Sequence, residues 1–175
     1  MIKSITAALL AVCLLAPRLA YADCFDEAAR YQHVDPMILR AIAWQESRGH
    51  ADAVHVNTNG TTDFGMMQVN SIHLRALSNY GISQQDLMKP CVSVYVGAWY
   101  LRQMMMRHKD TWSAVGAYHS ERPDERDKYS NSVMKIVANH CGGDGVRDAP
   151  AAACATLAGG RSYAMAEKPS AALGY

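Results

Sequence analysis

The sequence predicts a mainly helical α+β domain that carries one small β-hairpin. Asp35 and Pro36 indicate a helix start, because aspartate binds the first free backbone amides and proline fits the first helical position. Apolar residues at helical spacing over residues 91–108 indicate a long, largely buried helix. Between threonine-rich flanks, Asn59-Gly60 is typical of a hairpin turn. The chain therefore shows both helical spacing and a hairpin signal, which is why an α+β class is predicted.

The elements form one domain between an N-terminal segment and a tail. Residues 23–141 are long enough for a single helical core. Residues 142–175 are rich in alanine and glycine with little apolar periodicity, so we expect a flexible tail. The expected helices cover residues 25–33, 36–48, 69–79, 83–88, 91–108, 111–118 and 124–140.

The first 22 residues have the features of a secretory signal peptide. Lys3 precedes an apolar run over residues 5–16, and Ala20-Tyr21-Ala22 is a small-x-small cleavage site. The run is shorter than the roughly 20 residues that a membrane span needs. We therefore expect export to the periplasm, with cleavage after Ala22.

Composition restricts the classes of partner and of site. Without residues 1–22 the 17 basic residues become 15, against 16 acidic ones, so a nucleic-acid-binding basic surface is not indicated. Four cysteines remain in an exported chain, which favours a disulfide framework with three possible connectivities. The cysteines do not form close Cys/His pairs at ligand spacing, so we expect no metal and no cofactor. They are Cys24, Cys91, Cys141 and Cys154.

Glu46 is the first candidate catalytic residue. Ile38, Ile42 and Glu46 recur every four residues and share one helix face, so the carboxylate is in line with core side chains. Poor hydration and the negative end of the helix dipole would raise the pKa of Glu46, as a general acid at neutral pH requires. An exposed helix-terminal glutamate is the alternative interpretation.

Asp63 and the residues after it form the second candidate group. Asp63 is expected on or just beyond the return strand of the hairpin, where its carboxylate can face Glu46. Gly65 permits a close approach of chain and ligand, and Gln68 offers a donor and an acceptor to a sugar. A surface aspartate and a helix start with inward-facing methionines are the alternatives.

These motifs together resemble the soluble lytic transglycosylases of the goose-lysozyme-like superfamily. The resemblance covers residues 24–141 and is strongest for the small members that accompany type III and type IV secretion, conjugation and type IV pili. Its elements, in the order of the family, are Cys24-Phe25, Ala41-Ile42-Ala43-Trp44 through Glu46-Ser47, Gly65-Met66-Met67-Gln68-Val69-Asn70, Pro90-Cys91, Val96-Gly97-Ala98 and Ala114-Val115-Gly116-Ala117-Tyr118.

The resemblance implies a lysozyme-like fold with the hairpin beside an active-site groove. It implies catalysis by Glu46 with a secondary role for Asp63. Substrate contacts are then expected from Ser47, Gly65, Met67, Gln68, Tyr118, His119 and Tyr129. His119 stands where the family usually has asparagine. The resemblance also favours a disulfide between Cys24 and Cys91, which leaves Cys141 with Cys154.

The implied function is cleavage of peptidoglycan strands in the periplasm to 1,6-anhydromuramyl ends. This would open the wall for a secretion, conjugation or pilus apparatus, and we expect a monomer. A lysozyme-like muramidase is the alternative enzyme, and a noncatalytic peptidoglycan-binding scaffold is the alternative outside the enzymes. The chain lacks His-Glu-x-x-His and Gly-x-Ser-x-Gly, which disfavours a metallopeptidase or a serine hydrolase.

Overall fold

The computed structural model describes residues 16–109 and 111–142. Helices make up most of the described chain, and three short strands between α3 and η1 form one small sheet, which confirms the predicted α+β, mainly α class. The described elements are α2 (Ala16–Gln32), α3 (Pro36–Ser47), β1 (Val54–Val56), β2 (Thr62–Phe64), β3 (Val69–Asn70), the 3-10 helix η1 (Ser71–His73), α4 (Leu74–Ser78), the 3-10 helix η2 (Asp86–Met88), α5 (Pro90–His108), α6 (Thr111–His119) and α7 (Pro123–Gly142).

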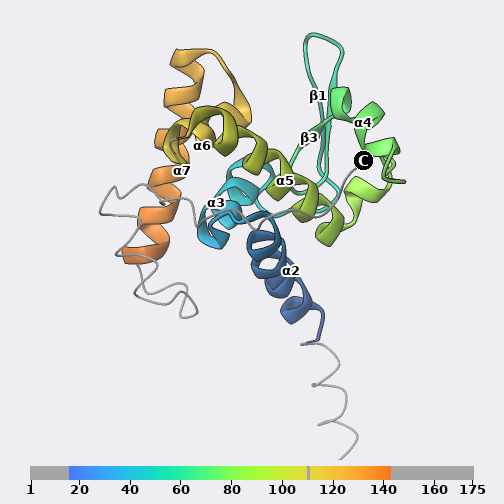
Figure 1. The fold of residues 1–175 in the computed structure, drawn as a ribbon. Helices are drawn as coiled ribbons and strands as arrows, with labels where there is room; N and C mark the ends of the chain where they lie inside the picture. Colours follow the sequence, from blue (N-terminus) through green and yellow to red (C-terminus); the bar gives the residue numbers. More distant parts are fainter. Residues whose placement is uncertain (1–15, 110, 143–175) are drawn as a thin grey trace, which may run out of the picture.

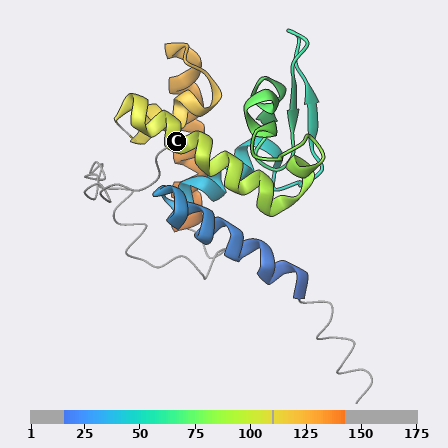
Figure 2. The same cartoon turned by 45° about the vertical axis from the view of Figure 1, so that its right-hand side comes forward.

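Helix α5 runs diagonally through the molecule between its two sides. The sheet and α4 lie on one side, and α6 and α7 lie on the other (Figure 1). Helix α5 packs on α2 and α6, while α3 packs on α2, α5 and α7. The turned view in Figure 2 shows the same separation of the sheet from α6 and α7. Helix α3 thus reaches the middle of the molecule, where the two sides meet.

Helix α3 has the predicted start and nearly the predicted end. The Asp35 side chain accepts hydrogen bonds from the amides of Met37 at 2.8 Å and Ile38 at 3.1 Å, and Pro36 occupies the first turn. The helix ends at Arg48, whose left-handed backbone (φ 56°) returns its amide to the carbonyls of the last turn. Because Ile38 and Ile42 are buried, their helix face directs Glu46 inward.

The predicted hairpin is present and gains a third strand. Strand β2 pairs antiparallel with both β1 and β3, so the order is β1-β2-β3. The amide of Gly60 donates to the Asn57 carbonyl at 3.0 Å, and the positive φ of 83° at Gly60 suits glycine. Asp63 lies on β2, opposite His55 of β1 and Asn70 of β3. This register fixes the surroundings of the Asp63 carboxylate.

Two predicted helices were wrong in part. Residues 69–79 were expected to be one helix, but Val69 and Asn70 form β3 because their backbone pairs with β2. The Asn70 side chain then accepts the Ile72 amide at 3.0 Å and begins η1, so helix follows only after the strand. Residues 83–88 form a 3-10 turn only at 86–88, since Ser83 and Asp86 bond to each other across it.

At the N-terminus, helix α2 begins at Ala16, nine residues before the expected start. The expected signal peptide lies partly outside the described residues, and the expected tail lies almost wholly outside them. Among the helices that the structure describes, none combines the length and the apolar character needed to cross a bilayer.

A disulfide joins Cys24 of α2 to Cys91 at the start of α5, with the Cα atoms 5.4 Å apart. This is the pairing that the family resemblance implied. It links residues 67 apart in sequence and holds α2 against α5. The expected pairing of Cys141 with Cys154 lies outside the residues whose side chains are described.

Replacing both Cys24 and Cys91 by serine is expected to lower the free energy of unfolding by about 3 kcal/mol, because a long loop is no longer closed in the unfolded chain. Urea denaturation followed by circular dichroism measures this loss. Replacing Ser78, an exposed serine on α4, by alanine serves as a remote control. An unchanged urea midpoint in the double variant would show that packing of α2 on α5 suffices.

Candidate active site

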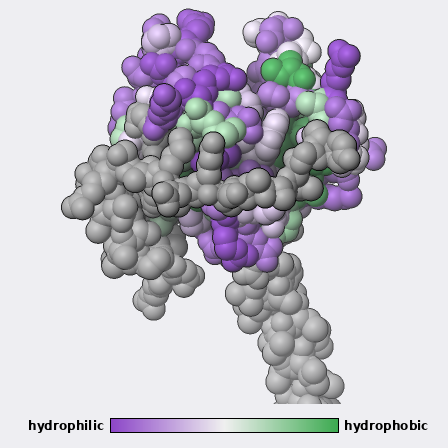
Figure 3. Space-filling model, in the orientation of Figure 1, coloured by the Kyte–Doolittle hydropathy of each residue, from purple (hydrophilic) through white to green (hydrophobic). Residues whose placement is uncertain are grey.

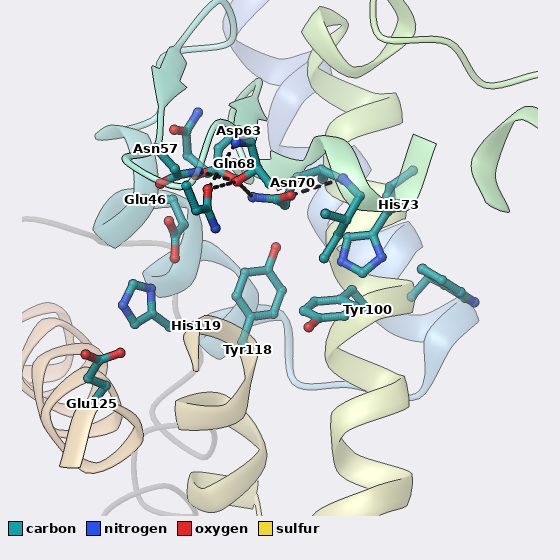
Figure 4. A pocket seen from close by; sticks show the side chains of 16 residues that line it. Glu46, Asn57, Asp63, Gln68, Asn70, His73, Tyr100, Tyr118, His119 and Glu125 are labelled. Carbon is teal, nitrogen blue, oxygen red and sulfur yellow. Dashed lines mark hydrogen bonds between the residues drawn. The ribbon is translucent and has the colours of Figure 1, made fainter. Parts of the chain in front are cut away.

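A groove of about 390 Å³ lies where α3, the sheet, α5 and the α6–α7 region meet (Figure 4). Its lining mixes carboxyl, amide, hydroxyl and aromatic groups, which suits a polar ligand with apolar ring faces. The surface over the upper parts of α6 and α7 is mostly hydrophilic, while hydrophobic residues gather beside the hairpin (Figure 3). The lining residues are Glu46, Asn57, Asn59, Thr61, Asp63, Gln68, Val69, Asn70, Ile72, His73, Val96, Trp99, Tyr100, Tyr118, His119 and Glu125.

Glu46 lies at the end of α3 and points into this groove (Figure 4). Its Oε1 accepts a hydrogen bond from the Tyr129 hydroxyl of α7, 83 residues away in sequence. Burial raises the pKa of Glu46 from 4.5 to about 7, opposed by the Tyr129 hydrogen bond and assisted by the charge of Asp63. A substantial fraction of Glu46 is therefore protonated at neutral pH, as a general acid requires.

Asp63 is held by two asparagine side chains. Asn57 Nδ2 donates to Oδ2 at 2.8 Å, and Asn70 Nδ2 donates to Oδ1 at 2.6 Å. The same two amides also donate to Thr61 Oγ1, at 3.1 and 3.0 Å. Amide donors on both oxygens match the acceptor-only form of a carboxylate. The network therefore fixes a negative charge that faces the groove and acts on Glu46.

Tyr118 is a buried residue that lines the groove. Its hydroxyl donates to the Met67 carbonyl at 2.9 Å, and its ring packs at 69° to the ring of Tyr100, with the centroids 5.2 Å apart. Burial raises the pKa of Tyr118 well above its ordinary value, with the charge of Glu46 as the next cause. Tyr118 is therefore a neutral hydrogen-bond donor in this site.

Gly65 and Met67 were expected to contact substrate, but both lie beneath the groove. A Cβ on Gly65 would collide with the Leu87 carbonyl, and its φ of 74° also favours glycine. The Met67 side chain is fully buried, and its amide donates to Ser93 Oγ of α5 at 3.0 Å. These residues anchor the loop between β2 and β3 on α5 rather than line the groove.

Ser47 and Gln68 attach the same loop to its neighbours. Ser47 Oγ donates to the Met66 carbonyl at 2.8 Å and does not line the groove. It therefore connects the end of α3, next to Glu46, to the loop. Gln68 does line the groove, with its Nε2 donating to the Gly65 carbonyl at 2.8 Å and the Ala53 carbonyl at 3.2 Å.

His119 and Tyr129 form a stacked pair at the other wall. Their ring centroids are 4.9 Å apart and their planes differ by 3°. His119 is exposed and lines the groove, whereas Tyr129 is buried and contacts Glu46. The structure thus brings Glu46, Asp63, Gln68, Tyr118 and His119 to one groove, with Tyr129 directly behind Glu46. The described residues contain no group of three or more His, Cys, Asp or Glu side chains arranged to hold a metal ion.

Comparison with known families identifies this arrangement. Residues 23–139 match the Transglycosylase SLT domain. The chain belongs to the SLT transglycosylase family. The matched range includes every groove residue described above. The protein is therefore an enzyme of the peptidoglycan lytic transglycosylase class.

This SLT domain protein is similar to proteins of Salmonella, Escherichia and Shigella. It is 38% identical over 132 residues to Invasion protein IagB of Salmonella typhimurium, covering 73% of this chain and 82% of the relative. It is 37% identical over 148 residues to X polypeptide of Escherichia coli K12, covering 79% and 88%. Protein IpgF of Shigella flexneri is 38% identical over 124 residues, covering 68% and 82%.

A solved structure has the same fold as this SLT domain. It is the lytic transglycosylase Slt inactive mutant E503Q from Pseudomonas aeruginosa, with a TM-score of 0.56 and 21% identity. The match covers 66% of this chain and 23% of the larger Slt chain. The likeness confirms the lysozyme-like fold.

Several groove residues of the SLT domain were not recognised from sequence. Asn57 and Asn70 hold Asp63. Asn70 stood at the end of the family motif over residues 65–70, but residues 69–79 were expected to be helical, so its contact with Asp63 was not predicted. Tyr100 was interpreted only as part of an apolar helix face, yet it packs against both His73 and Tyr118. These three partners come from η1, α5 and α6, so helical periodicity within one element does not reveal the aromatic row.

Proposed function

We propose that the protein cleaves the β-1,4 bond between N-acetylmuramic acid and N-acetylglucosamine in peptidoglycan and leaves 1,6-anhydromuramyl ends. The observation that carries this proposal is Glu46, a carboxyl with a pKa of about 7 inside a sugar-sized groove and opposite a second carboxyl, Asp63. The SLT family match supports the same substrate.

The reaction requires one group to act first as an acid and then as a base. Protonated Glu46 donates to the glycosidic oxygen, and the bond to the muramic acid anomeric carbon breaks as an oxocarbenium-like centre forms. The Glu46 carboxylate then takes the proton of the C6 hydroxyl, whose oxygen attacks that carbon. Glu46 is protonated again, and water is not consumed.

Asp63 assists by its charge. Its carboxylate is held on β2 by Asn57 and Asn70, so it need not reorganise when positive charge develops at the anomeric carbon. It also raises the pKa of Glu46 and so favours the acid form before the reaction. Gln68 lines the groove at a position suited to contacts with sugar hydroxyl or acetamido groups.

The proposed site of action is the periplasm, after removal of residues 1–22. The signal-peptide features of that segment support export. The proposed purpose is local opening of the wall for a secretion, conjugation or pilus apparatus. Similarity to Invasion protein IagB, a protein named for invasion, supports this proposed purpose.

Mass spectrometry of muropeptides tests the reaction. Purified mature protein is incubated with peptidoglycan, and Glu46→Gln is treated in parallel. Anhydromuramyl products from the unmodified protein alone are the expected result. Reducing muramic acid ends would instead show a hydrolase in which Asp63 positions water or acts as nucleophile. Absence of any product from the unmodified protein would favour a noncatalytic binding role.

The pKa of Glu46 predicts how the rate depends on pH. Glu46 must be protonated at the start, so kcat/KM should fall about tenfold per pH unit once the pH exceeds about 7. A turbidity assay of peptidoglycan suspensions from pH 5 to pH 9, at constant ionic strength, measures this limb. A descending limb centred near pH 4.5 would mean that burial does not hold the Glu46 carboxyl in its acid form.

A further inference from the structure

His119 directly follows the groove residue Tyr118 and itself lines the groove. It is the last residue of α6, and its ring lies parallel to that of Tyr129 on α7. The next residues hold it in place, because Glu121 pairs with Arg107 at 2.6 Å and with His108 at 3.0 Å at the end of α5. The ion pairs of Glu121 thus attach the segment after His119 to the end of α5, and this helps to keep the His119 ring stacked on Tyr129.

The stacked pair lies beside the catalytic carboxyl at the wall of the groove. His119 lines the groove and is exposed, while Tyr129 is only 7% exposed and donates its hydroxyl to Glu46. The flat His119 ring thus covers a face of Tyr129 that would otherwise be closer to groove water. An asparagine has no ring and could not cover the same area.

We propose that His119 is a positioning residue that shields the hydrogen bond between Tyr129 and Glu46 from water by stacking on the Tyr129 ring. The proposal rests on the proposed function, since it assigns His119 a task in the acid step. It differs from a sugar-binding role, in which the ring nitrogens of His119 would bind substrate hydroxyl groups. The required property is the flat ring, not the nitrogens.

The burial of Glu46 determines in which direction loss of the His119 ring should change the pKa of Glu46. Burial is the largest cause of the raised pKa of Glu46, so admission of water should lower that pKa toward its ordinary value. Besides Glu46 and His119, the titratable groups that line the groove are Asp63 on β2, His73 on η1, Tyr100 on α5, Tyr118 on α6 and Glu125 on α7. In Figure 4 Glu125 lies beyond His119 on the side away from Asp63. These groups remain unchanged when His119 alone is replaced.

The test compares three variants at position 119. His119→Ala and His119→Asn remove the ring, and His119→Phe keeps a flat ring without nitrogens. Removal of the ring is expected to move the descending limb of kcat/KM to lower pH by roughly one unit and to lower kcat about tenfold at pH 8, with KM within about twofold. His119→Phe should retain the limb of the unmodified protein. His50→Ala, an exposed histidine outside the groove, is the control.

A second measurement does not depend on activity. NMR titration of ¹³C-labelled glutamate carboxyl groups reports Glu46 directly, with its resonance assigned through Glu46→Gln. The Glu46 midpoint should fall in His119→Ala and stay unchanged in His119→Phe. Equal midpoints in all variants, or a raised KM in both His119→Ala and His119→Phe, would overturn the proposal in favour of sugar binding. Missing anhydro products would instead contradict the proposed function while this titration still decides the role of His119.

Discussion

Glu46→Gln is expected to reduce peptidoglycan cleavage by about a thousandfold or more. Glutamine has nearly the same shape and can still accept the Tyr129 hydroxyl, but it has no proton to transfer at neutral pH. The same substitution also removes the base for the second half of the reaction. Quantification of released muropeptides over time measures the loss.

The stability of Glu46→Gln is the control for this result. The pKa of Glu46 is higher in the folded chain, about 7, than its ordinary 4.5, so stability contributed by the acid form is lost as pH rises through 7. Glu46→Gln should therefore be more stable than the unmodified protein at pH 8, by up to about 3 kcal/mol, because each pKa unit corresponds to about 1.4 kcal/mol. The difference should vanish below pH 4.5. Equal cleavage by both proteins would remove Glu46 from the mechanism.

Asp63→Asn is expected to reduce cleavage by about a hundredfold. The substitution removes the fixed negative charge that faces Glu46 and the anomeric centre. It also leaves one acceptor for two donors, because Asn57 and Asn70 each donate to a separate oxygen of Asp63. One N–H of Asn57 or Asn70 then loses its acceptor, while the contact of that amide with Thr61 remains, and this adds a structural cost of about 1 to 3 kcal/mol.

The pH profile separates the charge effect of Asp63 from that structural cost. Because the Asp63 charge raises the pKa of Glu46, its removal should move the descending limb of kcat/KM to lower pH. Asp52→Asn, which removes an exposed carboxyl outside the groove, should leave rate and limb unchanged. Full activity of Asp63→Asn would show that Glu46 alone suffices and that the asparagine network serves the hairpin.

Local sequence was sufficient wherever neighbouring residues decide the structure. The Asp35 cap and Pro36 define the start of α3 within three residues, and the turn at Gly60 depends on its own backbone freedom. Helical spacing also placed Glu46 on the buried face of α3, and so predicted the raised pKa of its carboxyl. These features follow from contacts between residues a few positions apart.

Contacts between distant segments decided the rest of the site. Val69 and Asn70 become a strand only because β2 offers unpaired backbone groups beside them. Met67 lies in the core instead of the groove because α5 packs beneath its loop.

The surroundings of the catalytic carboxyl depend on such long-range packing most of all. Tyr129 reaches Glu46 across 83 residues, and His119 reaches Tyr129 only through the packing of α6 on α7. The residues alone likewise left three cysteine connectivities open, whereas the packing of α2 on α5 brings Cys24 and Cys91 together. Residue patterns identify local helix, turn and polarity, but which distant side chains meet depends on the burial of all elements at once.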